Sequence, residues 1–108
     1  MIALVLLAGA AGALLRFVTL RLIAAPWAVL VVNVVGSFIG GLLIGATTGE
    51  LRLILLSGFC GGLTTFSTFS VETVQLVMQR RVRTALLSVG ANLVLGIAAA
   101  ALGYLLVA

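Results

Sequence analysis

The side chains best suited to binding a ligand in this sequence are concentrated in one short run of an otherwise apolar chain. Phe66 and Phe69 are three residues apart and therefore share one face of a helix. Thr65 and Thr68 lie beside them, and Ser67 lies on the neighbouring stripe. The edge of a phenyl ring is the positive part of its quadrupole, so two rings can face a desolvated anion edge-on while hydroxyl groups complete the shell. Aromatic residues at helical spacing are usually core residues, but the flanking hydroxyls favour a path for a small, hard anion.

A second polar face is predicted in the segment 27–47. Asn33 is followed at i+3, i+4 and i+7 by the small residues Gly36, Ser37 and Gly40. These positions share one helix face, which is therefore small and polar. An interhelical hydrogen bond, worth about 0.6 kcal/mol on average in membranes, would explain Asn33 alone. In combination with the hydroxyl-rich run, we interpret this face as part of the same ion path.

Two charged residues, Arg16 and Glu72, are predicted to lie within membrane depth. Each costs about 2.5 to 3.5 kcal/mol there unless it is paired or hydrated, so both are candidates for function. Arg16 is expected to draw anions into a vestibule, and Glu72, six residues after Phe66, is expected to line the other end of the path. The alternative is that these side chains snorkel to the membrane interface.

The glycine pair Gly61 and Gly62, followed after one leucine by two threonines, is a poor helix-forming sequence in the middle of a crossing. We expect the helix to break there. Freed carbonyl groups at membrane depth are tolerated only where they are buried in protein or line a cavity. Carbonyl groups that converge from two subunits at such a break could hold a small cation. A plain packing kink is the alternative.

The composition limits the functions that are open to this chain. It has 108 residues, of which 64% are hydrophobic and 7% charged, and its mean hydropathy is +1.44. An ordinary soluble domain has about 25% charged residues. The chain has no His, no Lys and no Asp and a single cysteine, Cys60, so a Ser-His-Asp triad, a P-loop or a zinc cluster cannot form within it. An enzyme is therefore not expected. The net charge of +4 comes from scattered arginines, which are typical of lipid boundaries and not of a nucleic-acid surface.

Uncharged runs predict four transmembrane helices, at residues 1–20, 27–47, 53–78 and 84–107. The runs are apolar all round and show no strand-like alternation, and a helix satisfies its own backbone hydrogen bonds in lipid. The predicted fold class is an all-α integral membrane protein whose residues 1–108 form one four-helix domain. Small residues spaced four apart in the second helix, such as Gly36 and Gly40, favour tight helix association. Four helices scarcely enclose a water-filled path, so transport is expected to need a dimer.

At these positions the sequence resembles the Fluc (CrcB-type) fluoride channels. The similarity covers residues 9–17, 32–38 and 58–73, and the last segment is highly specific, with the pattern Gly-x-x-Gly-x-x-Thr-Thr-Phe-Ser-Thr-Phe-Ser-x-Glu. The resemblance implies an antiparallel, dual-topology dimer with two pores in the inner (plasma) membrane of the cell. Such a channel passes fluoride passively and selectively out of the cytoplasm and so relieves its toxicity. The partners implied are fluoride, membrane lipid and a second copy of the chain, with no nucleic acid.

The resemblance also assigns roles to single residues. It implies a fluoride pore lined by Phe66, Phe69, Asn33, Ser67 and Thr68. The main-chain oxygens of Gly61 and Gly62 would hold a central structural sodium ion (Na+). In the fourth helix the family commonly has Tyr and then Ser four residues on, where this chain has Ser88 and Asn92. Both residues can form hydrogen bonds at the same i, i+4 spacing, so we expect the polar track to be kept.

The distribution of arginines suggests a second mode of assembly. The first and third connections lie on one side of the membrane and carry Arg21, Arg80, Arg81 and Arg83, whereas the second carries Arg52. The positive-inside rule counts basic residues, so this bias of four to one predicts that both termini lie outside. A chain that inserts in both directions should be nearly balanced. A heterodimer with an oppositely oriented paralogue is therefore considered beside the homodimer.

Two other functions are considered. A small multidrug-resistance-type, proton-coupled exporter is also a small antiparallel assembly, but it needs a membrane-embedded carboxylate in the first helix. This chain has none there, and Glu72 in the third helix is the only candidate. A non-transporting assembly subunit would explain the glycines but not the track of rings and hydroxyls. Fluoride-specific flux without a pH gradient would distinguish the channel from the exporter.

Overall fold

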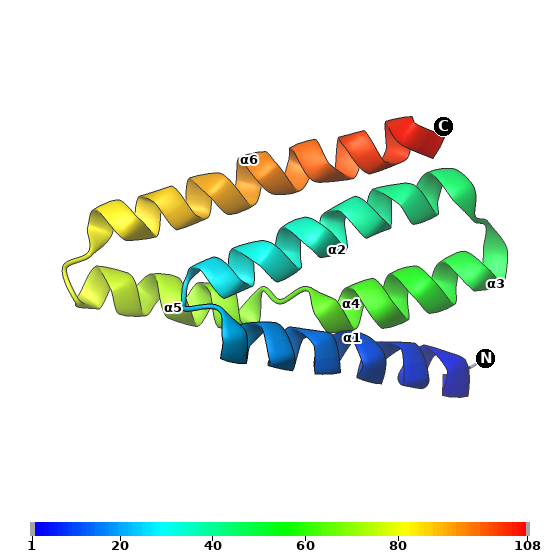
Figure 1. Ribbon diagram of the computed structural model, residues 1–108, viewed down its shortest axis with the longest axis horizontal. Coiled ribbons are helices and arrows are strands. Elements are labelled where there is room, and N and C mark those ends of the chain that lie inside the picture. Colours follow the sequence, from blue (N-terminus) through cyan, green and yellow to red (C-terminus); the bar gives the residue numbers. More distant parts are fainter. Residues whose placement is uncertain (1, 108) are drawn as a thin grey trace.

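The computed structural model describes residues 2–107, and these residues are almost entirely helical (Figure 1). Four stretches are long and apolar enough to cross a membrane: α1 (Ile2–Leu22), α2 (Trp27–Ala46), a composite span (Gly49–Met78) and α6 (Val82–Val107). The shortest has 20 residues, which matches the roughly 20 residues that a crossing requires. The predicted all-helical fold with four spans is confirmed for the described residues.

Local sequence explains where the first two helices begin and end. Pro26 has no N–H and is the N-cap residue of α2, so the chain turns between α1 and α2 at this point. α2 ends at Ala46, and its C-cap residue Thr47 is extended (φ −128°, ψ 163°) and donates its hydroxyl to the Leu43 carbonyl at 2.6 Å. Gly49 follows with φ +62°, a left-handed conformation that favours glycine. The third span begins earlier than the predicted residue 53, because α3 (Gly49–Arg52) is already helical.

The third span consists of α3, η1 (Leu53–Cys60), α4 (Gly61–Leu63) and α5 (Ser67–Met78). η1 is a π-helix, a feature that the sequence analysis did not predict. The predicted break is present, but Gly61 and Gly62 are still helical and the chain leaves the helix at Thr64 (φ −78°, ψ 155°). The Thr64 N–H still bonds the Cys60 carbonyl at 2.9 Å, so the first main-chain bond lost is the one that Thr65 would make.

Gly62 serves the packing of α1, and neither Gly61 nor Gly62 is the point of the break. A Cβ at Gly62 would collide with the Gly9 carbonyl, and a Cβ at Gly12 would collide with the Phe59 carbonyl. α1 therefore lies directly against η1 and α4, as Figure 1 shows. Such close backbone approach stabilises helix pairs in lipid, where the hydrophobic effect between helices is absent.

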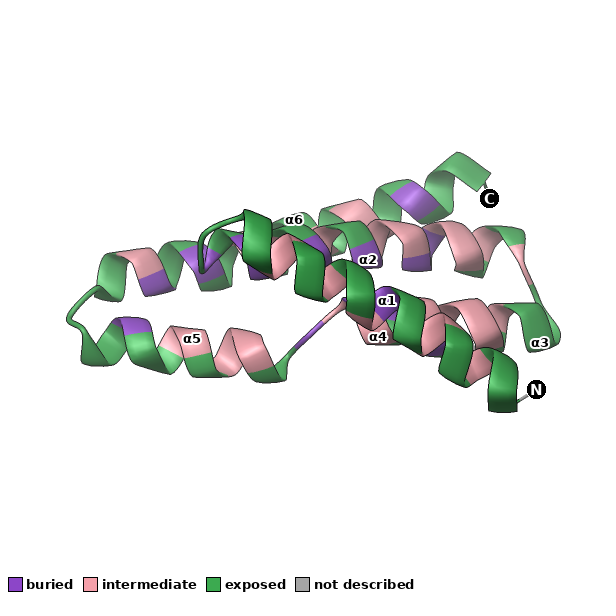
Figure 2. Cartoon of the chain, turned by 60° about the horizontal axis from the view of Figure 1, so that its bottom comes forward, coloured by how far each residue is buried: buried purple, intermediate pink, exposed green. Residues whose placement is uncertain are grey.

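α2 and α6 form the other tight pair and run side by side over most of their lengths (Figure 1). A Cβ at Gly41 would collide with the Ala100 carbonyl, and a Cβ at Gly103 would collide with the Phe38 carbonyl. Buried residues gather where these helices face the rest of the molecule, whereas α1 and the outer face of α6 are largely exposed (Figure 2). The exposed faces are apolar, as lipid contact requires.

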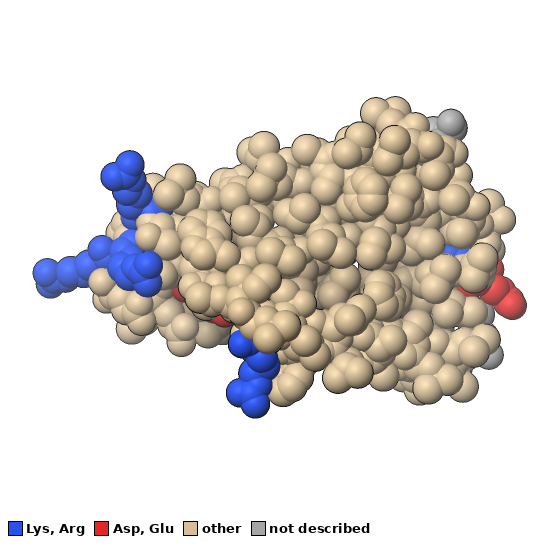
Figure 3. Space-filling view, in the orientation of Figure 1, with Lys and Arg blue, Asp and Glu red and all other residues tan. Residues whose placement is uncertain are grey.

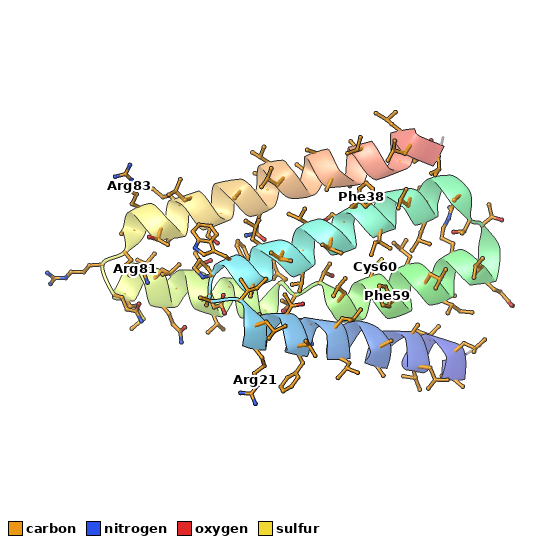
Figure 4. All side chains as sticks on the ribbon, in the orientation of Figure 1. Arg21, Phe38, Phe59, Cys60, Arg81 and Arg83 are labelled. Atoms are coloured by element: carbon orange, nitrogen blue, oxygen red, sulfur yellow. The ribbon has the colours of Figure 1, made fainter. Side chains whose placement is uncertain are left out.

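Basic side chains gather at the end of the molecule where α5 turns into α6 (Figure 3). Arg81 and Arg83 extend from this turn (Figure 4). The opposite end holds α3 with Glu50 and Arg52. The Arg52 guanidinium is not free, since its Nη2 donates to the Ile44 carbonyl at 2.7 Å and its Nε to the Thr47 carbonyl at 2.9 Å. It therefore caps the C-terminus of α2, where a positive charge is favourable.

Candidate ion pathway

The break in the third span is held from α2 by Asn33. Asn33 Nδ2 donates to the Thr65 carbonyl at 3.3 Å, and the Thr65 N–H donates to Asn33 Oδ1 at 2.9 Å. The side-chain amide therefore pairs with the main chain of a single residue. In an unbroken helix the Thr65 N–H would bond the carbonyl of Gly61. Asn33 thus compensates for the break at membrane depth, where an unsatisfied backbone group costs several kcal/mol.

A second contact with the break comes from α1. Arg16 is half-buried, and its Nη1 donates to the Thr64 carbonyl at 3.3 Å. This hydrogen bond brings the guanidinium to the point where the extended segment begins. The break is thus contacted by side chains from two other spans, one neutral and one positively charged.

Beside the break lies a cleft of about 450 Å³. Its lining comes from α2, the break, α5 and α6 and consists of Asn33, Ser37, Thr64, Thr65, Phe66, Phe69, Val89, Asn92 and Leu93. The centroids of the Phe66 and Phe69 rings are 6.2 Å apart, and their planes are inclined by 46°. None of these lining side chains carries a charge. The cleft offers an anion neutral hydroxyl and amide groups together with two aromatic rings.

α5 begins at this cleft. Phe66 is its N-cap residue, and the Thr68 N–H donates to Thr65 Oγ1 at 3.2 Å. The first N–H groups of a helix lack intrahelical partners and give this end a partial positive charge. The start of α5 therefore adds an electrostatic preference for anions to the neutral donors of the cleft.

The structure brings together part of the predicted pore set. The members that line the cleft are Asn33, Thr65, Phe66, Phe69 and Asn92. Ser67, Thr68 and Glu72 lie on α5 outside this lining, and the Glu72 Oε1 atom is buried with no hydrogen-bond partner within residues 2–107. Ser88 is only 1% exposed, and its carbonyl accepts a hydrogen bond from Asn92 Nδ2 at 2.8 Å.

Two residues of the lining, Ser37 and Thr64, were not among the predicted site residues. Ser37 lies four residues after Asn33 on the face that the sequence analysis recognised as small and polar, so a signal for it was present. Thr64 became part of the lining because the break begins at this residue. Both also line a second cleft, of about 620 Å³, between α2, α6 and the first half of the third span. The two clefts meet at the break.

Comparison with known proteins assigns the family. The model of the family described as "CrcB-like protein, Camphor Resistance (CrcB)" matches residues 3–104. The chain belongs to the CrcB family. The resemblance inferred from the sequence is thereby confirmed. Family membership and the four long apolar helices identify the chain as a multi-pass membrane protein.

Curated relatives in the family are similar to this chain over nearly its whole length. The fluoride-specific ion channel FluC 2 of Rhodococcus jostii is 47% identical over 106 residues, which cover 94% of this chain and 93% of the relative. A FluC of Thermus thermophilus is 44% identical over 112 residues (94% and 90%). FluC of Pyrococcus furiosus is 40% identical over 115 residues (97% and 94%). These relatives are named as ion channels, and ion channels are not a class of enzyme. Their names therefore agree with the expectation, drawn from the composition, that an enzyme is not expected.

Proposed function

We propose that this chain is the subunit of a fluoride-selective channel through which fluoride leaves the cytoplasm passively. The observation that carries the proposal is the similarity along nearly the whole chain to proteins named fluoride-specific ion channel. The uncharged cleft beside the break, with its hydroxyl, amide and aromatic groups, supports it. Neither a covalent step nor a proton carrier is needed.

Selectivity follows from replacing the hydration shell of a very small anion. Fluoride gives up its water only where hydrogen-bond donors and positive ring edges take the place of that water. Thr65, Asn92 and the ring pair provide such groups at the cleft. Ser67, Thr68, Ser88 and Glu72 extend the path along α5 and α6, and Arg16 raises the anion concentration at its entrance.

The working unit of this single-domain chain, residues 1–108, is an antiparallel dimer with two pores. In one chain the cleft is open on one side, and the Phe66 side chain is 80% exposed. A ring that stays exposed to lipid would not act on an ion. A second copy, packed across the break, closes the cleft and turns it into a passage.

A structural sodium ion is proposed at the centre of this dimer, held by the main-chain carbonyls of Gly61 and Gly62. The Thr65 N–H, which would bond the Gly61 carbonyl in a continuous helix, donates to Asn33 instead. This carbonyl is therefore available, and carbonyl oxygens are suitable ligands for a hard cation. The positive charge of the ion would attract the carbonyl groups at both breaks and so stabilise the contact between the two subunits.

A heterodimer is the second candidate assembly. The arginines at the turn between α5 and α6 are not balanced at the other end, where Arg52 is bound to the carbonyls that end α2. The positive-inside rule then favours one orientation. The relatives from Rhodococcus jostii and Thermobifida fusca are numbered FluC 2 and FluC 1, which indicates that some organisms have more than one such chain.

The deciding experiment is a fluoride-electrode efflux assay on liposomes that contain only this purified chain, with chloride as the comparison ion. We expect electrogenic fluoride efflux without a pH gradient and little chloride efflux. Flux that requires a proton gradient would instead support the exporter. Efflux that appears only when an oppositely oriented paralogue is added would support the heterodimer. Absence of fluoride efflux in both preparations would refute the channel.

A further inference from the structure

The turn between α5 and α6 carries a basic patch, which consists of Arg80, Arg81 and Arg83. All three residues are exposed, and their side chains gather at one end of the molecule (Figure 3). Arg80 has φ +61°, and its N–H donates to the Val77 carbonyl at 3.0 Å. The next N–H, that of Arg81, donates to the Leu76 carbonyl at 2.8 Å. These main-chain hydrogen bonds close the turn and hold the basic patch at the tip of the helix pair.

The charge of the basic patch is not compensated by the described part of the chain. Within residues 2–107, the guanidinium groups that donate hydrogen bonds are those of Arg16 and Arg52, and none of the patch donates to an oxygen. Glu50 lies on α3 at the opposite end of the molecule. Glu72 precedes Arg80 by eight residues, which is more than two turns of α5. The patch therefore presents its positive charge to whatever adjoins this end.

A row of exposed apolar residues follows Arg83 along α6. Leu87, Val94 and Ile97 come four, eleven and fourteen residues after it and so share its helix face. Their exposed fractions are 57%, 63% and 63%. Gly90 lies on the same face, and a Cβ there would meet no atom within 4 Å. This apolar row is thus an open track that begins at a positive charge.

The apolar row points away from the rest of the chain. Successive residues are about 100° apart around a helix, so Ala85 and Ser88 lie about 200° and 140° from Arg83. Both are buried, on the side where α6 packs against α2 (Figure 2). A side chain in the first turn of a helix leans toward the N-terminus, which carries the Arg83 guanidinium beyond the row (Figure 4). The charge therefore lies at the polar end of an apolar face.

We propose that this end of α6 binds an anionic phospholipid, whose phosphate lies against the basic patch and one of whose acyl chains follows the apolar row. Guanidinium groups bind phosphate oxygens through charge-assisted hydrogen bonds. The positive-inside rule predicts that the patch faces the cytoplasm, where the leaflet carries a negative surface potential. A phosphate ion in solution would satisfy the arginines but would leave the apolar row uncovered. The proposal does not depend on fluoride conduction.

Native mass spectrometry of the full-length chain, released from detergent, counts the bound lipid molecules. We expect phosphatidylglycerol to reach half-occupancy at a concentration at least about tenfold lower than phosphatidylcholine with the same acyl chains, because only the former has a net negative charge. Inorganic phosphate in large excess should not displace the bound phosphatidylglycerol. Displacement by inorganic phosphate would indicate a simple anion site and would overturn the proposal, as would equal half-occupancy of the two lipids.

Single substitutions locate the binding site. Arg81→Gln and Arg83→Gln are each expected to raise the phosphatidylglycerol concentration for half-occupancy about fivefold and to leave phosphatidylcholine unaffected. Arg21→Gln is the matched control, since it removes the same charge from α1, where the guanidinium stacks on the Phe17 ring at 5.2 Å (Figure 4). Its half-occupancy should change less than about twofold, because attraction to lipid charge is local.

The comparison of the three variants decides between a site and a general effect of charge. An equal change in all three would show that only the net charge matters and would contradict the proposal. Unchanged half-occupancy in both Arg81→Gln and Arg83→Gln would contradict it as well. All three positions are exposed, so the variants are expected to fold and to elute as the unmodified chain does. The assay contains no fluoride, so its failure is distinct from failure of the proposed function.

Discussion

Phe66 and Phe69 illustrate what spacing alone can and cannot predict about single residues. Their separation by three positions led to the prediction of one shared helix face, and both rings do line one cleft, with centroids 6.2 Å apart. The geometry nevertheless differs from that of a continuous helix, because Phe66 is the N-cap residue of α5 and only Phe69 lies within it. Their role in permeation remains a prediction.

Substitution of Phe66 by Ile tests this role. Phe66→Ile keeps apolar bulk but removes the quadrupole, so we expect fluoride efflux from liposomes to fall about tenfold. Helical circular dichroism and elution from a sizing column should be unchanged. Phe17→Ile is the matched control, since Phe17 is 56% exposed on α1 and its ring stacks with Arg21 at 5.2 Å, outside the cleft. Undiminished efflux in Phe66→Ile would contradict the argument from ring edges.

The glycines of the third span show how one local pattern can have two structural explanations. The run Gly61-Gly62-Leu63-Thr64-Thr65 correctly predicted a break, although the glycines themselves remain helical. The small size of Gly62 is used for contact with α1, and this contact depends on which helix lies opposite. The break begins three residues after Gly61 because Asn33 captures the Thr65 N–H.

Gly12 on α1 tests the close contact between the spans. Gly12→Ala would drive a Cβ into the Phe59 carbonyl and the Leu63 main chain, so we expect a loss of about 1 to 3 kcal/mol of stability. The measurement is the thermal midpoint in detergent. Gly90→Ala, with no neighbour within 4 Å of the added Cβ, should be neutral or stabilising by up to about 1 kcal/mol. Equal midpoints for the two variants would refute the packing argument.

Removal of sodium tests the carbonyl site proposed at Gly61 and Gly62. We expect efflux to decline when Na+ is replaced on both sides of the membrane by a bulky organic cation, because carbonyls facing one another across the dimer would lose the charge between them. Readdition of Na+ should restore the rate. Full activity after exhaustive removal would count against the site.

At the scale of the whole molecule, the asymmetric distribution of charge bears on orientation. The turn between α5 and α6 carries Arg80, Arg81 and Arg83, whereas Arg52 at the other end is bound to main-chain carbonyls. Both ends of the described chain, at α1 and α6, lie at this other end (Figure 1). The positive-inside rule therefore predicts that they face away from the cytoplasm.

Reporter fusions to the C-terminus test this orientation. We expect a fused alkaline phosphatase, which is active outside the cytoplasm, to give a strong signal, and a fused green fluorescent protein to give a weak one. Replacing Arg80, Arg81 and Arg83 together by Gln should bring the two signals close to balance. Equal signals from the unmodified chain would show dual insertion and would favour the homodimer over the heterodimer.

The sequence by itself determined the membrane class, the four spans and the family, because lipid forces each apolar segment to satisfy its own backbone. Only the tertiary structure decided the start of the break at Thr64, the packing role of Gly62 and the inclusion of Ser37 in the cleft. Each depends on which helix lies opposite. The hydrogen bonds that arrange the cleft join residues 32 and 59 positions apart, and no local pattern specifies such pairings.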